Sequence, residues 1–386
     1  MNESKASRYQ RLRRRAHVAG ISSGALLLTI LALTPLSQWL AASAQDMGAW
    51  LPEPLHSGLA ATAFVALVLV LWEIVALPAV LYLGLSLDRR FRNADHSVED
   101  LLAAQAQASL VGLAAALVAA AIVLFAARAA GDWWWLLAGG LLGVTLVGAL
   151  RSAPVVLPLF GQARPIARPS LMSTLRELAR RSDVPVSDIV EWRVQPGARG
   201  GALVAGIGHT HRVFVTSELL QDWSDDEIAV VVAHELGHHV HYDLWQTTGL
   251  DALVLSVALW TAGQALAFLS PALSLSGPAD LAALPLIALV TGGVWLLATP
   301  LRHALSRHHE RRADQFALQL TGGADAFSAA VRRLSARHLA EERPSTLTRW
   351  LFHRHPSVAE RLALAELFSK AASRAGAREG SVLTGS

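Results

Sequence analysis

The sequence predicts a mainly α fold, in which several helices cross a membrane and a smaller α+β part with a small sheet lies outside it. Composition supports this prediction, because 53% of the 386 residues are hydrophobic and only 16% are charged, whereas an average soluble domain has roughly 25% charged residues. Six apolar stretches also approach the length of about 20 residues that a helix needs to cross a bilayer. Two polar regions carry the helical and alternating patterns of a folded domain.

The six apolar stretches form a group of four and a group of two. We expect residues 1–150 to be an N-terminal membrane domain with four spans. Residues 151–370 would be a second domain, which a two-span membrane hairpin interrupts at about 245–301, and residues 371–386 resemble a flexible tail. The stretches are Ala16–Leu36, Leu59–Leu83, Ala108–Ala127, Trp133–Leu150, Ala252–Leu269 and Leu281–Leu301.

Basic residues indicate how the spans are oriented. Six lysines and arginines precede the first stretch, and none lies between the first and the second. Because positively charged connections remain in the cytoplasm, we expect the N-terminus and both polar regions to be cytoplasmic. No convincing signal-peptide cleavage site follows the first stretch, so we expect six retained spans. The positions of the arginines are thus explained by the orientation of the spans in the membrane. We expect the lipid bilayer to be a partner of the chain, and we expect no nucleic acid partner.

The first polar region predicts a helix followed by a small sheet. Met172–Arg181 has the apolar spacing of a helix, and Ile189–Val194 alternates as a strand does. Ala202–Ala205 and Arg212–Thr216 are two further strands, which the turn Gly206–Thr210 joins into a hairpin.

In the second span, Glu73 is costly to bury in lipid, so we expect it to face the bundle interior or a water-filled cavity.

A helix from Ser224 to about Tyr242 carries the chemistry, and its Ser-Asp-Asp-Glu start is a capping box. His234 and His238 are four residues apart and share one face, so both imidazoles can reach one ion, and Glu235 lies beside its open side. The chain has no cysteine, so histidine and carboxylate must hold any metal. Zinc suits two imidazoles, a carboxylate and a water, whose proton Glu235 would accept.

The third ligand is expected from a distant carboxylate. The metzincin spacing, in which a third histidine lies six residues after the second, is excluded because Leu244 stands at that position and no glycine stands at 241. Glu310 and Asp314 lie one turn apart on the helix that follows the sixth span, and two crossings return this helix to the side of the histidines. We therefore expect one zinc ion per chain, with Glu310 as ligand and Asp314 accepting a hydrogen bond from a ligand histidine. The alternative for Glu310 is an ion pair with Arg307 or Arg311.

His355-Pro356 and Arg361 complete a set of motifs that resembles a known family, although spacing alone also allows His355-Pro356 to be an ordinary helix start. With His234–His238 and the two carboxylates, these motifs resemble the type I CAAX prenyl endopeptidase family and its bacterial heat-shock membrane-protease relatives. Leu77–Tyr82 and Asp88-Arg89-Arg90 are similar to the N-terminal membrane domain of the CAAX branch. The resemblance covers nearly the whole chain.

This resemblance implies a zincin-like (gluzincin) catalytic domain with zinc bound by His234, His238 and Glu310, catalysis by Glu235, and substrate or transition-state contacts from His355 and Arg361. We expect His355 to donate a hydrogen bond to the oxygen that becomes negative as the peptide bond is attacked. We expect Arg361 to anchor the substrate backbone or to hold His355 in place.

The strand before the catalytic helix departs from the family. Where the family has Asn-Ala, this chain has Gly201-Ala202. We expect Gly201, Ala202, Leu203 and Val204 to form an edge to which an extended substrate adds through backbone hydrogen bonds. The glycine removes an amide that would orient the substrate, without affecting the metal.

These features predict a membrane-embedded zinc endopeptidase that acts on membrane or membrane-tethered polypeptides. The arginine-rich, lysine-poor composition favours a bacterial cytoplasmic membrane, where CAAX prenylation of the substrate is not expected. Two alternatives are a regulatory sensor-type membrane metalloprotease and a non-enzymatic membrane protein with a structural metal. The short outer loops argue against the first, and the second would require four closing ligands and would leave Glu235 without a purpose.

Overall fold

The computed structural model describes residues 4–53, 55–92, 97–193 and 201–383, which divide into two compact units. The helical unit comprises Arg8–Thr145 and Gly249–Thr299. The mixed unit comprises Met1–Ser7, Leu146–Thr248 and Pro300–Ser386. The chain therefore enters and leaves each unit more than once.

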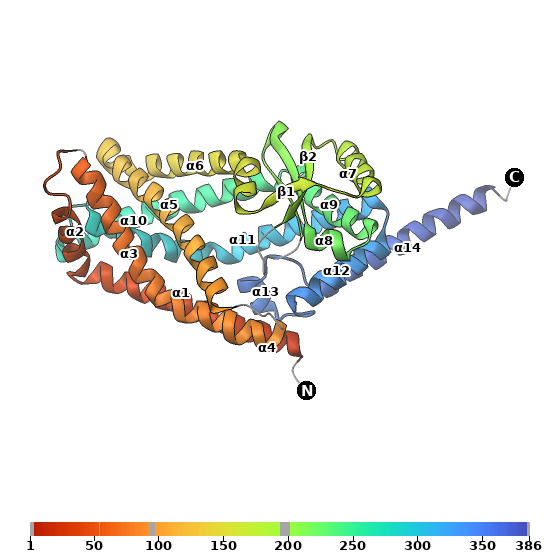
Figure 1. Cartoon of the computed structure of the whole chain (residues 1–386), viewed down its shortest axis with the longest axis horizontal. Helices are drawn as coiled ribbons and strands as arrows, with labels where there is room; N and C mark the ends of the chain where they lie inside the picture. Colours follow the sequence, from red (N-terminus) through yellow and green to blue (C-terminus); the bar gives the residue numbers. More distant parts are fainter. Residues whose placement is uncertain (1–3, 54, 93–96, 194–200, 384–386) are drawn as a thin grey trace. The chain divides into compact units, whose positions relative to one another are not determined.

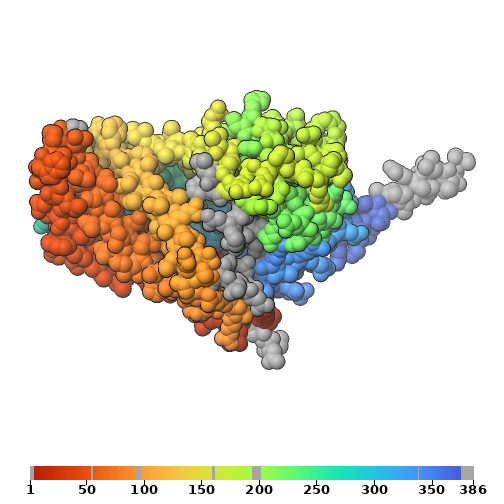
Figure 2. All heavy atoms as spheres, in the orientation of Figure 1, coloured from red at the N-terminus to blue at the C-terminus, as the bar shows by residue number. Residues whose placement is uncertain are grey.

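Long helices build the helical unit (Figure 1). In the space-filling view, the side chains of its N-terminal helices form a closely packed surface coloured red to orange (Figure 2). Some of the helices continue along the chain into the mixed unit. The elements are α1 (Lys5–Leu33), α2 (Leu36–Asp46), α3 (Leu55–Leu81), the π-helical segment Tyr82–Asp88, α4 (Arg89–Arg92), α5 (Val98–Ala130), α6 (Trp134–Val156), α10 (Asp243–Leu273) and α11 (Leu284–Thr321).

Five helical stretches among the described residues are long and apolar enough to cross a membrane. The mean hydropathy of their most apolar windows lies between 1.8 and 2.7, and at most 33% of any window is buried. Large apolar side chains such as Val144, Phe268 and Leu297 are exposed. Helices with apolar outer faces are those that lipid surrounds, so the chain is an integral membrane protein.

The third of these stretches, Val98–Val156, has 59 residues and contains both the third and the fourth expected spans. The short 3-10 turn Gly131–Trp133 separates α5 from α6, and Gly131 has a φ of 50°, which a glycine adopts without strain. In Figure 1 the chain changes direction there. The six expected spans thus lie in five continuous stretches, and the number of crossings stays a prediction.

The core of the helical unit includes Leu31 of α1, Phe64 of α3, Trp134 of α6 and Leu266 of α10, all buried. Near the middle of α3, Glu73 accepts a hydrogen bond of 2.7 Å from Gln105 Nε2 of α5. The carboxylate therefore faces a neighbouring helix, which gives a polar partner to a group that is costly in lipid.

A four-stranded sheet lies in the mixed unit. It contains the expected hairpin, and its long strand begins three residues before the expected Ile189, while Val194 lies outside the described residues. β2 and β4 are parallel and the other pairs are antiparallel. The first strand was not expected, and the third strand lies at an edge. The strands are β1 (Gln162–Pro165), β2 (Val186–Arg193), β3 (Ala202–Ala205) and β4 (His211–Thr216), in the order β1-β2-β4-β3.

The helices of the mixed unit include the two that the sequence predicted in this region. The last helix continues to Leu383, so the expected flexible tail is helical over most of its length. Its helical state follows from an alanine-rich sequence with no proline after residue 356. The helices are α7 (Pro169–Arg181), α8 (Ser217–Asp222), α9 (Asp225–Val240), α12 (Ala324–His338), α13 (Thr346–Phe352) and α14 (Val358–Leu383).

Helix α9 is the centre of the mixed unit's core. Ile228, Val232 and Leu236 are fully buried in the same cluster as Val213 of β4 and Phe327 of α12. One side of α9 also lies very close to α11. A Cβ atom added at Gly237 would come within 3.1 Å of Ala313 Cα, so a larger residue would push the two helices apart by a few tenths of an ångström. The close approach brings the acidic residues of α11 next to the histidines of α9.

Candidate metal centre

The start of α9 is fixed by its own sequence. Ser224 Oγ accepts a hydrogen bond of 3.3 Å from the backbone N–H of Glu227, and the Glu227 carboxylate accepts one of 3.0 Å from the Ser224 N–H. Arg168 additionally pairs with Asp225. These bonds satisfy free N–H groups of the first turn. The expected capping box is therefore present, and it sets where the following turns of α9 present their side chains.

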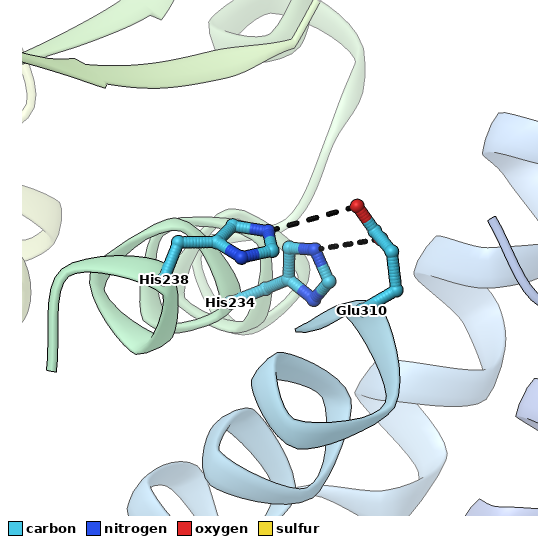
Figure 3. Close-up of side chains that lie close together, drawn as sticks. All are labelled: His234, His238 and Glu310. Carbon is cyan, nitrogen blue, oxygen red and sulfur yellow. Dashed lines mark ion pairs between the residues drawn. The ribbon is translucent and has the colours of Figure 1, made fainter. Parts of the chain in front are cut away.

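Two imidazoles of α9 converge on one carboxylate of α11. His234 Nε2 lies 3.4 Å from Glu310 Oε2, and His238 Nε2 lies 3.7 Å from Glu310 Oε1. Figure 3 shows both rings turned toward this carboxylate. One ligand atom from each of the three residues lies within 4.8 Å of the other two. This is the donor set and the spacing that one metal ion requires.

The outer nitrogens of both imidazoles face carboxylates. Asp314 Oδ1 lies 2.9 Å from His234 Nδ1, and Asp243 Oδ2 lies 2.9 Å from His238 Nδ1. Carboxylates in this position fix the tautomer and the orientation of a ligating histidine. Asp314 was expected in this role and Asp243 was missed. The available signal was its place five residues after His238.

A backbone turn brings Asp243 to the site. Tyr242 has a φ of 57°, so the chain turns between α9 and α10, and the side chain of Asp243, the first residue of α10, contacts His238. Arg312 pairs with Asp243 from α11. The Asp243 side chain is only 5% exposed. Its ion pair with Arg312 therefore stabilises a carboxylate that solvent hardly reaches.

The charge of the site attracts a cation. Burial would lower the pKa of His234, but Asp314 and Glu310 outweigh it and raise this pKa to about 10. Two carboxylates therefore hold a positive charge at the imidazole. A metal ion at His234 Nε2 would be stabilised by the same two carboxylates in place of the proton. The residues of the site therefore fit a metal ion.

Glu235 is beside the cluster and is not engaged in it. Burial raises its pKa, while His234 and His238 oppose this rise. Among the residues that the structure describes, no hydrogen bond or ion pair holds its carboxylate. A carboxylate with a raised pKa and no fixed partner is suited to exchange protons.

The structure places the two C-terminal candidates on carboxylates of α11. His355 Nδ1 lies 2.8 Å from Glu310 Oε2, with 67% of its side chain exposed. Arg361 Nε and Nη2 donate hydrogen bonds of 2.8 and 2.5 Å to the two oxygens of Asp314. We expected Arg361 to contact the substrate or His355. Its partner in the structure is Asp314 instead. Arg361 reaches the metal cluster through Asp314 and His234.

Strand β3 lies at the edge of the sheet, and no other strand among the described residues pairs with its outer side. The Thr216 N–H donates a hydrogen bond of 3.0 Å to the Gly201 carbonyl, and in an antiparallel pair the direction of these groups then alternates. Ala202 and Val204 therefore turn their backbone groups away from β4. Consistent with this, His239 Nε2 lies 3.2 Å from the Val204 carbonyl.

The neutral state of His239 fits this contact. Burial and the neighbouring His211 lower the pKa of His239 to about 4, so the ring carries one proton at neutral pH, on the nitrogen that faces the carbonyl. His239 thus supports the edge of β3 and lies outside the group formed by His234, His238 and Glu310. The backbone groups of Ala202 remain at the edge.

Comparison with known proteins assigns the chain to a family. Residues 165–367 match the model of peptidase family M48, and residues 2–162 match the model of the CAAX prenyl protease N-terminal domain, described as five membrane helices. The first match covers more than half of the chain. The chain therefore belongs to peptidase family M48.

Individual relatives agree with this assignment. The chain is 30% identical over 221 residues to the uncharacterized metalloprotease YhfN of Bacillus subtilis, covering 55% of this chain and 51% of that protein, about half of its length. It is 32% identical over 218 residues to a protease HtpX homolog of Nostoc punctiforme, covering 53% and 70%. The crystal structure of S. mikatae Ste24p shares the fold, with a TM-score of 0.71 at 19% identity, over 93% of this chain and 87% of that one. The family resemblance and the fold class predicted from the sequence are confirmed.

Proposed function

We propose that the protein is a zinc-dependent endopeptidase that hydrolyses peptide bonds of membrane or membrane-tethered polypeptides. The convergence of His234, His238 and Glu310 on one point carries this proposal, together with the uncommitted Glu235 beside them. Zinc suits this ligand set, because two imidazoles and one carboxylate leave a position open. One ion per chain would be bound.

The chain's own residues would divide the work of hydrolysis. A zinc ion held by the three ligands would supply Lewis acidity to a carbonyl and to a water. Glu235 would take the proton of the attacking water and pass it to the leaving amine. Asp314 and Asp243 would keep both imidazoles oriented through their Nδ1 atoms.

His355 would stabilise the charge that develops on the substrate oxygen. Its Nδ1 is directed at Glu310, which leaves Nε2 as the nitrogen that a substrate can reach. The high exposure of the ring makes this nitrogen accessible from outside. A donor in this position acts where negative charge grows during the attack.

An extended substrate would pair with β3. The outward backbone groups of Ala202 offer a donor and an acceptor for strand addition, and Gly201, Leu203 and Val204 complete this edge. At Gly201 an added Cβ atom would meet no atom of the residues that the structure describes within 4 Å. The space for the asparagine of the family is therefore present although the side chain is not.

We further propose six crossings, with the N-terminus and the metal site on the cytoplasmic side of a bacterial membrane. The arginines before the first apolar stretch support a cytoplasmic N-terminus, and six crossings would return the chain to that side. Tags at the N-terminus and at Ser386 should then be accessible from the cytoplasm and a reporter in residues 270–278 from outside. Protection of all three on the same side would contradict it. The substrate class follows from the membrane helices and is proposed without a requirement for a prenyl group.

One experiment tests the proposed function. The purified full chain is assayed for zinc content and for cleavage of casein, with chelator and with zinc restored. Glu235→Gln should retain zinc and lose about 10²–10⁴-fold in rate, the usual contribution of a general base, whereas the exposed Glu366→Gln should behave as the parent. Parent activity in Glu235→Gln would refute the mechanism. Bound zinc with no hydrolysis in the parent would favour a structural metal.

A further inference from the structure

A groove of about 540 Å³ lies in the helical unit, between α1, α3 and α11. Its volume is within the range of about 300–1,000 Å³ that small-molecule sites occupy. Its lining is almost wholly apolar, with His17 at one end. Every residue that lines it belongs to the helical unit, so the groove is a feature of that unit alone. We name it the α1–α3–α11 groove.

Small residues create this groove. Gly292 and Gly293 of α11 line it, and a Cβ atom added at either would meet no other atom within 4 Å. Trp72 of α3 also lines the groove, and its ring lies against Gly24 of α1, where an added Cβ atom would come within 2.4 Å of the ring. The wall is thus closely packed and the glycine side is open. The groove is therefore a shaped space and not a gap between loosely packed helices.

The length of the groove matches one leaflet of a bilayer. Along α1 it extends from Ala16 to Leu28, which at a rise of about 1.5 Å per residue is about 18 Å. The hydrocarbon core of a bilayer is about 30 Å thick, so one leaflet takes about 15 Å. A membrane-spanning helix needs the full thickness and would extend well beyond the groove. A single hydrocarbon chain of one leaflet fits it.

One end of the groove is positively charged. Helix α1 contains five arginines and no acidic residue. Arg13 is three residues before Ala16 and four before His17, so it continues the groove-lining face of α1 by one turn. Among the residues that the structure describes, Arg13 forms no ion pair. Its guanidinium is therefore available to an anion at the headgroup level.

We propose that the α1–α3–α11 groove is a binding site for an anionic phospholipid. One acyl chain would lie along Gly292 and Gly293, and the phosphate would contact Arg13, with His17 beside it. The charge at one end and the leaflet-long apolar part together match an amphiphile with a negative headgroup, and neither feature alone would. This site is separate from the metal centre, so it holds whether or not the proposed peptidase activity is correct.

Native mass spectrometry of the full chain, released from nanodiscs of equal phosphatidylglycerol and phosphatidylcholine, tests the proposal. We expect one phosphatidylglycerol to be retained in preference to phosphatidylcholine. Arg13→Gln should reduce this preference about fivefold, the usual effect of one basic residue near an anionic headgroup. Arg15→Gln is the matched control, because it removes the same charge about 200° around α1, away from the groove.

Filling the groove is the second arm of the test. Gly292→Leu should abolish retention of the lipid, whereas Gly143→Leu should not, although it also adds a leucine where no atom lies within 4 Å of the new Cβ. Equal retention of both lipids by the parent would overturn the proposal, and so would equal effects of the two arginine variants. Equal losses in the two leucine variants would assign the effect to helix packing and also overturn it. A dimer that Gly292→Leu dissociates, with lipid unchanged, would show that a second copy fills the groove instead.

Discussion

Replacing Arg361 tests whether it acts on the metal ligands or on the substrate. Its guanidinium makes two hydrogen bonds to Asp314, and the two side chains are only 17% and 1% exposed. It also lies over the Phe327 ring, with Cζ 5.6 Å from the ring centroid. Arg361→Met keeps much of the packing and removes the charge. The buried Asp314 carboxylate then loses the guanidinium and keeps only His234 as a partner among the described residues.

The structure gives this variant two separate effects. Removing one partner of a buried ion pair costs up to about 3–5 kcal/mol, which is a large part of a typical stability of about 5–15 kcal/mol. Asp314 also holds His234 Nδ1 at 2.9 Å. Freeing Asp314 from Arg361 should therefore loosen the ligand, and partners of this kind commonly change metal affinity by about 10–100-fold.

A double variant separates the two effects. Arg361→Met with Asp314→Asn removes both charges, so much of the lost stability should return. Zinc affinity should stay low, because the neutral amide no longer supports His234 as a carboxylate does. Stability is measured by thermal unfolding in detergent and zinc affinity by competition with a chelator.

Arg311→Met is the control for this series. Arg311 lies 3.7 Å from Glu360 and half of its side chain is exposed, so its loss should cost no more than about 1 kcal/mol. Zinc affinity should not change in this control. The reasoning fails if Arg361→Met keeps the parent's unfolding temperature and zinc affinity and raises KM alone. Arg361 would then be a substrate contact, as first expected from the sequence.

Three further substitutions test other parts of the site. Glu310→Ala should lose zinc to a chelator that the parent resists, because two imidazoles do not close the site, and stoichiometric zinc in this variant would reject the ligand. His355→Ala should lower kcat by about 10²–10³-fold, the effect of losing one oxyanion donor, with zinc content unchanged; an unchanged kcat would leave His355 as a helix-start residue. Gly201→Asn should lower KM for peptides and leave zinc unchanged, since the side chain has room there, and a higher KM would place the substrate elsewhere.

Local patterns were enough to predict the central part of the site. The capping box at Ser224 and the spacing of His234 and His238 fix a helix and one of its faces without reference to the rest of the chain. Glu310 and Asp314 were found in the same way, as a pair one turn apart. What these residues contact depends on helix packing, and the sequence signal for that packing was Gly237, where α9 and α11 come together.

Contacts that depend on a turn or on distant segments were missed. Asp243 points at His238 only because Tyr242 adopts a left-handed conformation, which is uncommon for a tyrosine and has no sequence pattern. Strand β1 has four residues without alternation and exists because it pairs with β2. The partner of Arg361 is 47 residues away on another helix. The spacing of residues within α14 therefore could not show whether Arg361 contacts Asp314 or a substrate.

The membrane hairpin explains how ligands so far apart in sequence meet. Between His238 and Glu310 the chain forms most of α10 and α11, and closing a flexible loop of that length would be entropically costly. Here the loop is not flexible, because Leu259 and Leu266 of α10 are buried in the same core as Leu286 of α11. The chain leaves the mixed unit in α10 and re-enters it in α11, and these two helices pack against each other in between. The sixth apolar stretch, which by itself says nothing about catalysis, is therefore what makes Glu310 available to the histidines of α9.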